Sequence, residues 1–291
     1  MRASICLFFS FLIPLLSSLQ AQVNYSADSL RVVRAEWRTD SLDGFVFKRY
    51  HFDEGALFCS AQHLFLIEIP PQSERRLAFV CDTQLTTVSE FAHRAGAYAA
   101  VNGSFFDIER GNPVCYLRIA GRQWGENTPS ATDSVNRKYY QYATLALTDG
   151  RPSLLVPDSN RLWEETLQDS NIMTAGPMLL RDGRPVPQRD DRTFVTHRHN
   201  RTALGIRPDG TTLILVVDGR FKDCAEGLSL PELERVMRWL GCTDAINLDG
   251  GGSSTMYIQG KPHNGVVNYP SDNKRHDHDG QRPVSNALLI L

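Results

Sequence analysis

The sequence has no excess of charge of either sign. Its 291 residues contain 31 Lys and Arg against 33 Asp and Glu, which gives a formal net charge of −2. Proteins that bind nucleic acid or anionic membranes usually carry a basic excess or a dense block of Lys and Arg. Neither is present, so we expect no nucleic-acid partner. We also expect no membrane partner once the N-terminal segment described below is removed.

Long apolar runs are also lacking, apart from one at the N-terminus. Met1 and Arg2 supply a positive charge, and residues 5–16 form an apolar stretch too short to span a bilayer comfortably. Ala21 then offers a small residue for cleavage. We therefore predict that residues 1–21 are a signal peptide and that the protein is secreted or periplasmic. The alternative is a retained N-terminal anchor.

Several familiar catalytic motifs are missing. The chain has no Gly-x-Ser-x-Gly nucleophile elbow, no Walker phosphate loop and no Gly-x-Gly-x-x-Gly dinucleotide fingerprint. We therefore expect no cofactor. His276-Asp277-His278-Asp279 contains residue types that bind metals, but its polar surroundings are typical of a solvated loop, so we expect no metal either.

Cysteine is scarce, with 6 in the whole chain. Cys6 lies within the predicted signal peptide, and an odd number therefore remains, so at least one thiol is unpaired within the chain. One or two disulfides are possible in an oxidising compartment, but the spacing assigns no pair and does not resemble a zinc site. The remaining cysteines are Cys59, Cys81, Cys115, Cys224 and Cys242.

Short runs of β-branched and aromatic residues, separated by turn residues, fill most of the chain. The N-terminal part, residues 22–74, is a β-rich lead-in with strands predicted at 31–37, 44–52 and 63–69. Further along, 201–206 and 212–217 are predicted to form a hairpin with its turn at residues 208–210.

Capping patterns predict two helices. One starts near Thr87, with Glu90 as its capping partner, and stops at Gly96; the other starts at Ser229 and stops at Gly241. Together with the strands, they predict an α+β fold: a single domain with a large, mainly antiparallel or mixed β-sheet and a few packed helices.

Three predicted strands end in a turn that combines glycine with a carboxylate or an amide. Arg201 opens the strand that pairs with the one before Asp218, so hairpin geometry predicts that these two residues lie close together. If adjacent strands bring all these ends together, one cleft holds carboxylates, amides and arginines. Taken singly, each Asp-Gly is also typical of an ordinary turn. The strand-end residues are Asn102 and Asp107, Asp218 and Arg220, and Asn247 and Asp249.

The densest of these turns is Asn247-Leu-Asp-Gly-Gly-Gly-Ser253. Its three glycines allow the backbone to approach a ligand closely, and their N–H groups can form an anion-binding nest. With Arg201 and Arg220 nearby, such a turn suits a phosphate group. The alternative is a plain glycine-rich hairpin with polar flanks.

These motifs occur in an order that resembles the phosphodiester glycosidase family. The residues that carry the resemblance are Ala100-Val-Asn-Gly-Ser-Phe-Phe106, Arg201-Thr-Ala-Leu-Gly205, Asp218-Gly219 and Asp244-Ala-Ile-Asn-Leu-Asp-Gly-Gly-Gly-Ser-Ser-Thr255. It covers residues 75–291, which we take as the catalytic domain. The resemblance implies hydrolysis of the glycosidic C–O bond of a sugar-1-phosphate diester, which releases a free, N-acetylglucosamine-like sugar and leaves a phosphomonoester.

On this resemblance, the catalytic candidates are Asp249, Asp218 and Asp107, with their individual roles left open, and Glu226 is a further candidate for an acid. The expected partner is a phosphorylated glycan or a sugar-1-phosphate diester. Two alternatives remain: a non-catalytic carbohydrate or cell-wall-polymer binder, and a phosphodiesterase that cleaves the P–O bond. The substrate-binding candidates are Asn102, Arg201, Asn247, Gly250, Gly251, Gly252, Ser253 and Arg220.

Overall fold

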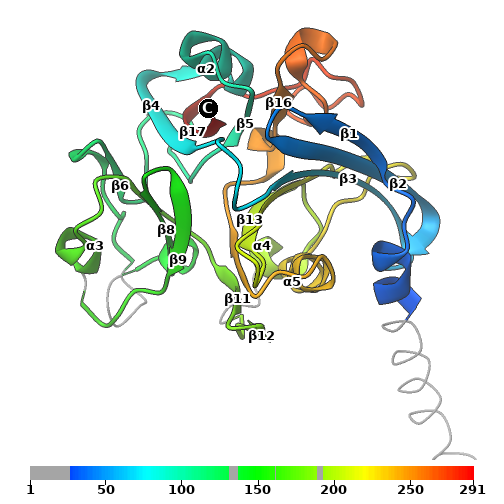
Figure 1. The fold of residues 1–291 in the computed structure, drawn as a ribbon, viewed down its shortest axis with the longest axis horizontal. Coiled ribbons are helices and arrows are strands. Elements are labelled where there is room, and N and C mark those ends of the chain that lie inside the picture. Colours follow the sequence, from blue (N-terminus) through cyan, green and yellow to red (C-terminus); the bar gives the residue numbers. More distant parts are fainter. Residues whose placement is uncertain (1–26, 131–136, 161, 189–192) are drawn as a thin grey trace, which may run out of the picture.

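The computed structural model describes residues 27–130, 137–160, 162–188 and 193–291. The predicted signal peptide lies outside these residues. The strands form three sheets of eight, five and four strands, and every strand pairing within them is antiparallel (Figure 1). The predicted α+β fold is therefore confirmed, with two smaller sheets beside the large one.

The eight-stranded sheet brings the N-terminal strands next to the central hairpin. The strand β3 (Ser60–Ile69) pairs with β14 (Thr212–Val217), so the lead-in residues continue the sheet that carries most of the predicted site motifs. In spatial order the strands are β1 (Arg38–Leu42), β2 (Phe45–Leu57), β3 (Ser60–Ile69), β14 (Thr212–Val217), β13 (Arg201–Ile206), β15 (Asp244–Asn247), β11 (Met178–Arg181) and β12 (Arg184–Pro185).

The two smaller sheets come from the middle and the end of the chain. The five-stranded sheet runs β7 (Arg122–Gly125), β6 (Leu117–Ile119), β10 (Ile172–Ala175), β8 (Ala143–Thr148) and β9 (Arg151–Leu155). The four-stranded sheet runs β16 (Met256–Ile258), β5 (Ala99–Asn102), β17 (Val284–Ile290) and β4 (Leu77–Thr86). Short 3-10 turns lie at η1 (Tyr139–Gln141), η2 (Gly251–Ser253) and η3 (His263–Gly265).

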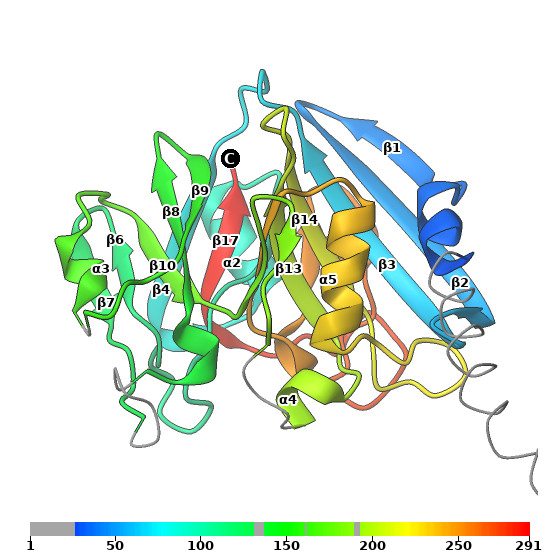
Figure 2. The same cartoon turned by 90° about the horizontal axis from the view of Figure 1, so that it is seen from below.

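The main hydrophobic core lies between one face of the large sheet and the two smaller sheets. There, Phe47 and Ile67 pack with Val101 and Leu145. The opposite face of the large sheet is covered by α5 (Leu230–Trp239) and α4 (Thr193–Thr196), as Figure 2 shows. The helix α2 (Val88–Ala95) packs on the four-stranded sheet, and α3 (Trp163–Thr166) lies beside the five-stranded one.

Both capping predictions are confirmed. The Thr87 hydroxyl accepts a hydrogen bond from the Glu90 N–H at the start of α2, and Gly96 ends that helix in a left-handed conformation. At the start of α5, Ser229 and Glu232 form a reciprocal capping box. Local sequence fixes both helix ends because these bonds satisfy N–H groups that the helix itself leaves free.

The strand predicted at residues 31–37 is wrong. Residues 27–33 are helical, and the first strand starts only at Arg38. Asp28 pairs with Arg31 at 2.9 Å, one helical turn away, and Val32 is buried in the core beneath α5. In a run this short, the spacing of apolar residues does not distinguish the two-residue period of a strand from the 3.6-residue period of a helix.

The described residues contain no disulfide, because all five cysteines among them are free. Cys115 and Cys242 are buried, whereas Cys59 is exposed. None of the helices in the described ranges has both the length and the apolar character needed to cross a membrane.

Candidate active site

The turn after β15 forms one wall of a cavity of about 500 Å³, which we call the Asp249 cavity. This volume lies within the usual range for small-ligand sites. Asp249, Gly250 and Gly251 contribute from the turn, and the predicted Arg201 and Arg220 also line the cavity. Five of the residues singled out from the sequence therefore line one cavity.

The turn crosses from one sheet to another. The strand before it, β15, belongs to the eight-stranded sheet, whereas β16 after it belongs to the four-stranded sheet. Its glycines permit this close packing: a Cβ on Gly250 would lie 2.7 Å from the Asn200 carbonyl oxygen, and Gly251 has a φ of +61°. The hairpin alternative considered from sequence is therefore wrong.

The predicted amide nest is only partly available to a ligand. The Gly250 N–H donates to the Asp249 carboxylate at 2.8 Å, and the Gly251 N–H donates to the Asn200 carbonyl at 2.9 Å. Gly252 does not line the cavity; it packs under Arg282 and Asp272. The glycines thus serve close backbone packing more than anion binding.

Asp249 is the only carboxylate among the described residues that line the cavity. Burial raises the pKa of Asp249 to about 6, against the opposing effects of the Ser253 hydroxyl, the Gly250 N–H and the charges of Arg282 and Arg220. A carboxylate with such a pKa is largely ionised at neutral pH and still accepts protons readily.

The two arginines in the cavity differ in how firmly they are held. Arg201 is 2% exposed and donates to the carbonyl oxygens of Leu228, Phe194 and His197 at 2.8–3.0 Å. The Arg220 side chain makes no hydrogen bond or ion pair within the described ranges, and it lies over Gly251. Arg201 is thus fixed, whereas Arg220 is free to bind a ligand.

The cavity has an aromatic wall that the sequence did not predict. Phe105 stacks on Tyr140 with ring centroids 4.6 Å apart, and Phe194 meets Phe105 edge to face at 5.9 Å. Phe105 belongs to the motif at residues 100–106, but Tyr140 and Phe194 lie in segments with no distinguishing pattern. Such a surface suits the apolar face of a sugar ring.

His199 also lines the cavity, and the sequence did not single it out, because the polar, basic composition of residues 184–200 is typical of a surface loop. Instead, this region contains α4 and bridges to Leu228. Burial, together with the charges of Arg201 and Arg220, lowers the pKa of His199 to about 4. The imidazole is therefore neutral at pH 7.

The predicted amides position the turn and do not line the cavity. Asn102 is buried; its amide donates to the Asp249 carbonyl at 2.7 Å, and its oxygen accepts from Thr202 and Thr255. Asn247 is also buried and donates to the Gly176 carbonyl at 2.9 Å. Both side chains therefore hold the backbone around Asp249, and Ser253 is buried there as well.

Asp218 lies on the other face of the large sheet from Arg201, which corrects the predicted common cleft. The predicted hairpin forms and Arg201 pairs with Val217 in it, but successive side chains of a strand point to opposite faces. Asp218 is fully buried and accepts from the Asn268 amide at 2.9 Å and from the Tyr269 N–H. It does not line the Asp249 cavity.

Asp218→Asn is expected to make the protein more stable at pH 8. Burial raises the pKa of Asp218 from its ordinary 3.8 to about 8. Between these values the folded protein holds a proton that the unfolded chain has lost, so stability falls as the pH rises. Asparagine does not titrate, so it removes this pH-dependent loss of stability. Urea unfolding should show a free energy of unfolding higher than that of the wild type by on the order of 2 kcal/mol at pH 8, and the difference should vanish near pH 4.

Asp223→Asn is the matched control, because Asp223 is exposed. It should leave the free energy of unfolding unchanged at pH 8 and at pH 4. A loss of stability at pH 8 in Asp218→Asn would show that the native carboxyl is ionised. Ligand binding in the Asp249 cavity should stay unchanged in both variants, since Asp218 lies outside its lining.

The remaining carboxylate candidates also lie outside the cavity lining. Asp107 accepts from the N–H groups of Glu109 and Arg110 and so caps its own turn. Glu226 pairs with Arg198 at 3.0 Å. Both therefore have local structural partners, and the predicted set of three aspartates is not brought together.

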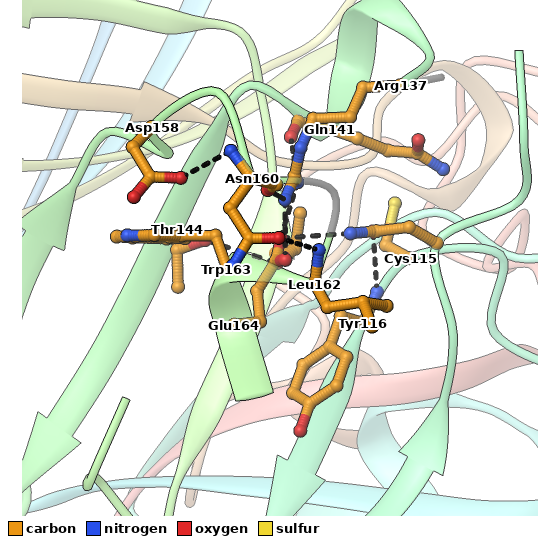
Figure 3. A network of polar contacts seen from close by, with 12 residues as sticks. Cys115, Tyr116, Arg137, Gln141, Thr144, Asp158, Asn160, Leu162, Trp163 and Glu164 are labelled. Atoms are coloured by element: carbon orange, nitrogen blue, oxygen red, sulfur yellow. Dashed lines mark hydrogen bonds and ion pairs between the residues drawn. The ribbon is translucent and has the colours of Figure 1, made fainter. Parts of the chain in front are cut away.

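A buried ion pair supports the segment that carries the aromatic wall (Figure 3). Arg137 donates to both carboxylate oxygens of Glu164, at 2.6 and 2.7 Å, and both side chains are buried. Asn127 and Thr174 also donate to Glu164, at 2.9 and 3.0 Å. Residues 138–140, which follow Arg137 directly, line the cavity.

Comparison with protein families adds a second line of evidence. The model of the phosphodiester glycosidase family matches residues 95–291. Bovine N-acetylglucosamine-1-phosphodiester alpha-N-acetylglucosaminidase is 28% identical over 203 residues, which are 64% of this chain and 35% of the relative. An uncharacterized SPbeta prophage-derived protein of Bacillus subtilis is 34% identical over 97 residues, 33% of this chain and 15% of that protein. The chain spans about a third or less of these curated relatives.

Solved structures agree on the fold. The catalytic domain of zebrafish N-acetylglucosamine-1-phosphodiester alpha-N-acetylglucosaminidase, described as auto-inhibited by its pro-peptide, superposes with a TM-score of 0.64 at 18% identity, covering 87% of each chain. A hypothetical protein from Synechocystis gives a TM-score of 0.60 at 13% identity, covering 87% of this chain and 63% of the other. At such identities these likenesses concern the fold alone.

Proposed function

The chain belongs to the phosphodiester glycosidase family, and on that premise we propose that its Asp249 cavity hydrolyses the glycosidic C–O bond of a sugar-1-phosphate diester. The observation that supports this most directly is a single carboxylate that shares a cavity with two arginines and an aromatic wall. Ordinary glycosidases use a pair of carboxylates, one of them an acid for the leaving group. A phosphate needs no such acid.

The arginines take the phosphate in this proposal. Arg220 binds its oxygens by a charge-assisted contact, and the fixed Arg201 neutralises the charge that builds up as the C–O bond breaks. The electron pair of that bond stays on the phosphate oxygen, which leaves as part of a phosphomonoester. The attraction between the two guanidinium groups and the phosphate is stronger in a partly buried site than in water, because water screens the charges less there.

Asp249 acts on the other side of the bond as the general base. Its carboxylate removes a proton from water, and the water oxygen forms the new bond to the anomeric carbon. The pKa of about 6 supports this role, because a base works best when its pKa is close to the operating pH. Asn102 and Asn247 are positioning residues, since they hold the turn without reaching the cavity.

The sugar packs against Phe105, Tyr140 and Phe194 in this proposal. N-acetylglucosamine is the proposed sugar because the names of the bovine and mouse relatives specify it.

We also propose that residues 1–21 direct export, so that the protein acts outside the cytoplasm. Residues 75–291 form the catalytic domain in this proposal, with 22–74 as a lead-in.

Hydrolysis in heavy-oxygen water tests the reaction. The mature protein, given UDP-N-acetylglucosamine or a phosphodiester of N-acetylglucosamine 1-phosphate, should release free sugar that carries the label, because water attacks carbon. Mass spectrometry of both products gives the position. Label in the phosphate would mean P–O cleavage and would replace this proposal with a phosphodiesterase, whereas tight binding without turnover would indicate a carbohydrate-binding protein.

A further inference from the structure

A second cavity, of about 410 Å³, shares no lining residue with the first. We call it the His63 cavity. Its floor is the end of the large sheet formed by β1, β2 and β3, and its wall is the loop that contains Tyr269 and His278. Nothing in the proposed reaction uses it.

Strand register shows how the floor is built. Arg38 on β1 stands directly opposite Arg49 on β2, which stands opposite Phe65 on β3. Two residues further along, His51 stands opposite His63, so both rows share one face of the sheet. The floor therefore presents two guanidinium groups beside two imidazoles.

The two arginines form no ion pair among the described residues, and the carboxylate on which both charges act, Asp40, is bonded by Lys261. Like charges directly opposite each other on paired strands are destabilising, and neither Arg38 nor Arg49 forms an ion pair among the described residues. Glu36 is the one carboxylate among the described residues that line this cavity, and it is exposed. Nearby Asp40 is already paired with Lys261 at 2.8 Å. An arrangement that costs the empty protein stability is expected where an anion binds.

The wall of the cavity is a stack of rings. His63 lies parallel to Tyr269, with centroids 5.4 Å apart, and Tyr269 packs against His276 and His278 at 4.2 and 4.3 Å. The His278 imidazole is held by a 2.7 Å contact between its Nδ1 and the Asn268 carbonyl. These ring faces give a sugar or another flat ligand a surface to pack on.

The floor also contains an imidazole nitrogen without a hydrogen-bond partner. His63 Nδ1 is buried and unpaired in the described structure, and it lies 4.0 Å from the Asp218 carboxyl, beyond hydrogen-bonding distance. Burial, with the neighbouring charges of His51, His276 and Arg49, lowers the pKa of His63 to about 3. Nδ1 is buried and faces the Asp218 carboxyl, so the neutral ring can hydrogen-bond a ligand hydroxyl only through Nε2.

We propose that the His63 cavity binds a phosphorylated sugar at a site separate from the Asp249 cavity. Arg38 and Arg49 hold the phosphate, because paired guanidinium groups match its oxygens. The sugar packs on Tyr269 and reaches His63 with a hydroxyl. A metal ion is not the occupant proposed, since the described residues contain no group of three or more His, Cys, Asp and Glu side chains arranged to hold one.

Histidine NMR tests this site directly, because each cavity has its own reporter. In the full mature chain labelled with 13C in the histidine rings, His51, His63 and His278 report on the His63 cavity and His199 on the Asp249 cavity. Glucose 6-phosphate should shift the first set saturably, inorganic phosphate more weakly, and glucose not at all. Arg49→Gln should weaken this binding about tenfold or more, since a charged hydrogen bond is lost.

Three controls make the test decisive. Arg184→Gln removes the same charge from the exposed strand β12 and should leave the affinity unchanged. Asp249→Asn should also leave it unchanged, which separates this site from the reaction proposed above. Arg49→Gln relieves the like-charge pair and should be no less heat-stable than the wild type; Arg38→Gln on the edge strand β1 gives an independent version of the test.

Two results would overturn the site. One is a shift confined to His199, which would mean that sugar phosphates bind only in the Asp249 cavity. The other is equal affinity in wild type, Arg49→Gln and Arg38→Gln, which would mean that the arginines do not hold the phosphate.

Discussion

Asp249→Asn is expected to lower kcat/KM for sugar release by about 1,000-fold, the range that loss of a general base produces. Asparagine can still accept the 2.8 Å hydrogen bond from the Gly250 N–H, so the turn should keep its shape. It cannot, however, take a proton from water. Steady-state assays on a phosphodiester of N-acetylglucosamine 1-phosphate measure the loss, and circular dichroism with thermal melting verifies the fold.

Asp107→Asn is the matched control, because it makes the same change in a carboxylate that only caps its own turn. It should retain activity near that of the wild type. Retention of more than a tenth of the activity by a folded Asp249→Asn protein would remove Asp249 from the reaction and return attention to Asp218.

The same carboxylate should set the acid limb of the pH profile. Burial, the largest influence, raises the pKa of Asp249 to about 6, and the base works only when ionised. In the free enzyme, kcat/KM should therefore fall as the pH drops through about 6 and level off above pH 7. A rate that stays flat down to pH 5 would contradict this assignment.

Glu164→Gln is expected to destabilise the protein by about 3–5 kcal/mol, the usual cost of removing one partner from a buried ion pair. Arg137 would remain buried beside a neutral amide. Burial alone acts to raise the pKa of Glu164, but the hydrogen bonds and charge of Arg137 outweigh it and hold that pKa below its ordinary value. Urea unfolding at pH 7 gives the change in the free energy of unfolding.

The neighbouring Glu165→Gln is a matched control because Glu165 is exposed, and it should change stability by less than about 0.5 kcal/mol. Arg137→Met combined with Glu164→Leu should recover most of the loss, since replacing both partners removes the uncompensated charge. A single Glu164→Gln variant as stable as the control would mean that the pair contributes little.

Activity adds a second readout for this ion pair. Arg137 directly precedes the residues 138–140 that line the Asp249 cavity, whereas Glu164 touches no part of it. Loosening the pair should therefore raise KM more than it lowers kcat, because the sugar-binding wall loses its fixed position while Asp249 does not.

The sequence predicted what depends on local pattern. Helix caps at Thr87 and Ser229, and the hairpin of residues 201–206 and 212–217, were correct because each follows from bonds between residues close in the chain. The shared cleft of Arg201 and Asp218 was wrong although the hairpin was right. Adjacent strand positions face opposite ways, and the pairing alone did not say which face each side chain would take.

Other parts of the site depend on contacts that no local pattern marks. Arg137 and Glu164 are 27 residues apart and look like ordinary surface charges in the sequence. His199 and Phe194 lie in a stretch whose basic, polar composition is typical of a solvated loop. The glycine triplet was recognised as important, yet whether its amides face a ligand or the protein depends on Asn200, which comes from another part of the chain.

The reactive turn joins strands of two different sheets, and this has a consequence for folding. Asn102, on the four-stranded sheet, bonds both Thr202 of the eight-stranded sheet and the backbone of Asp249. The turn therefore takes its shape only when the two sheets are docked against each other. On the proposed function, a chain with both sheets formed but undocked would contain Asp249 and still have no active site.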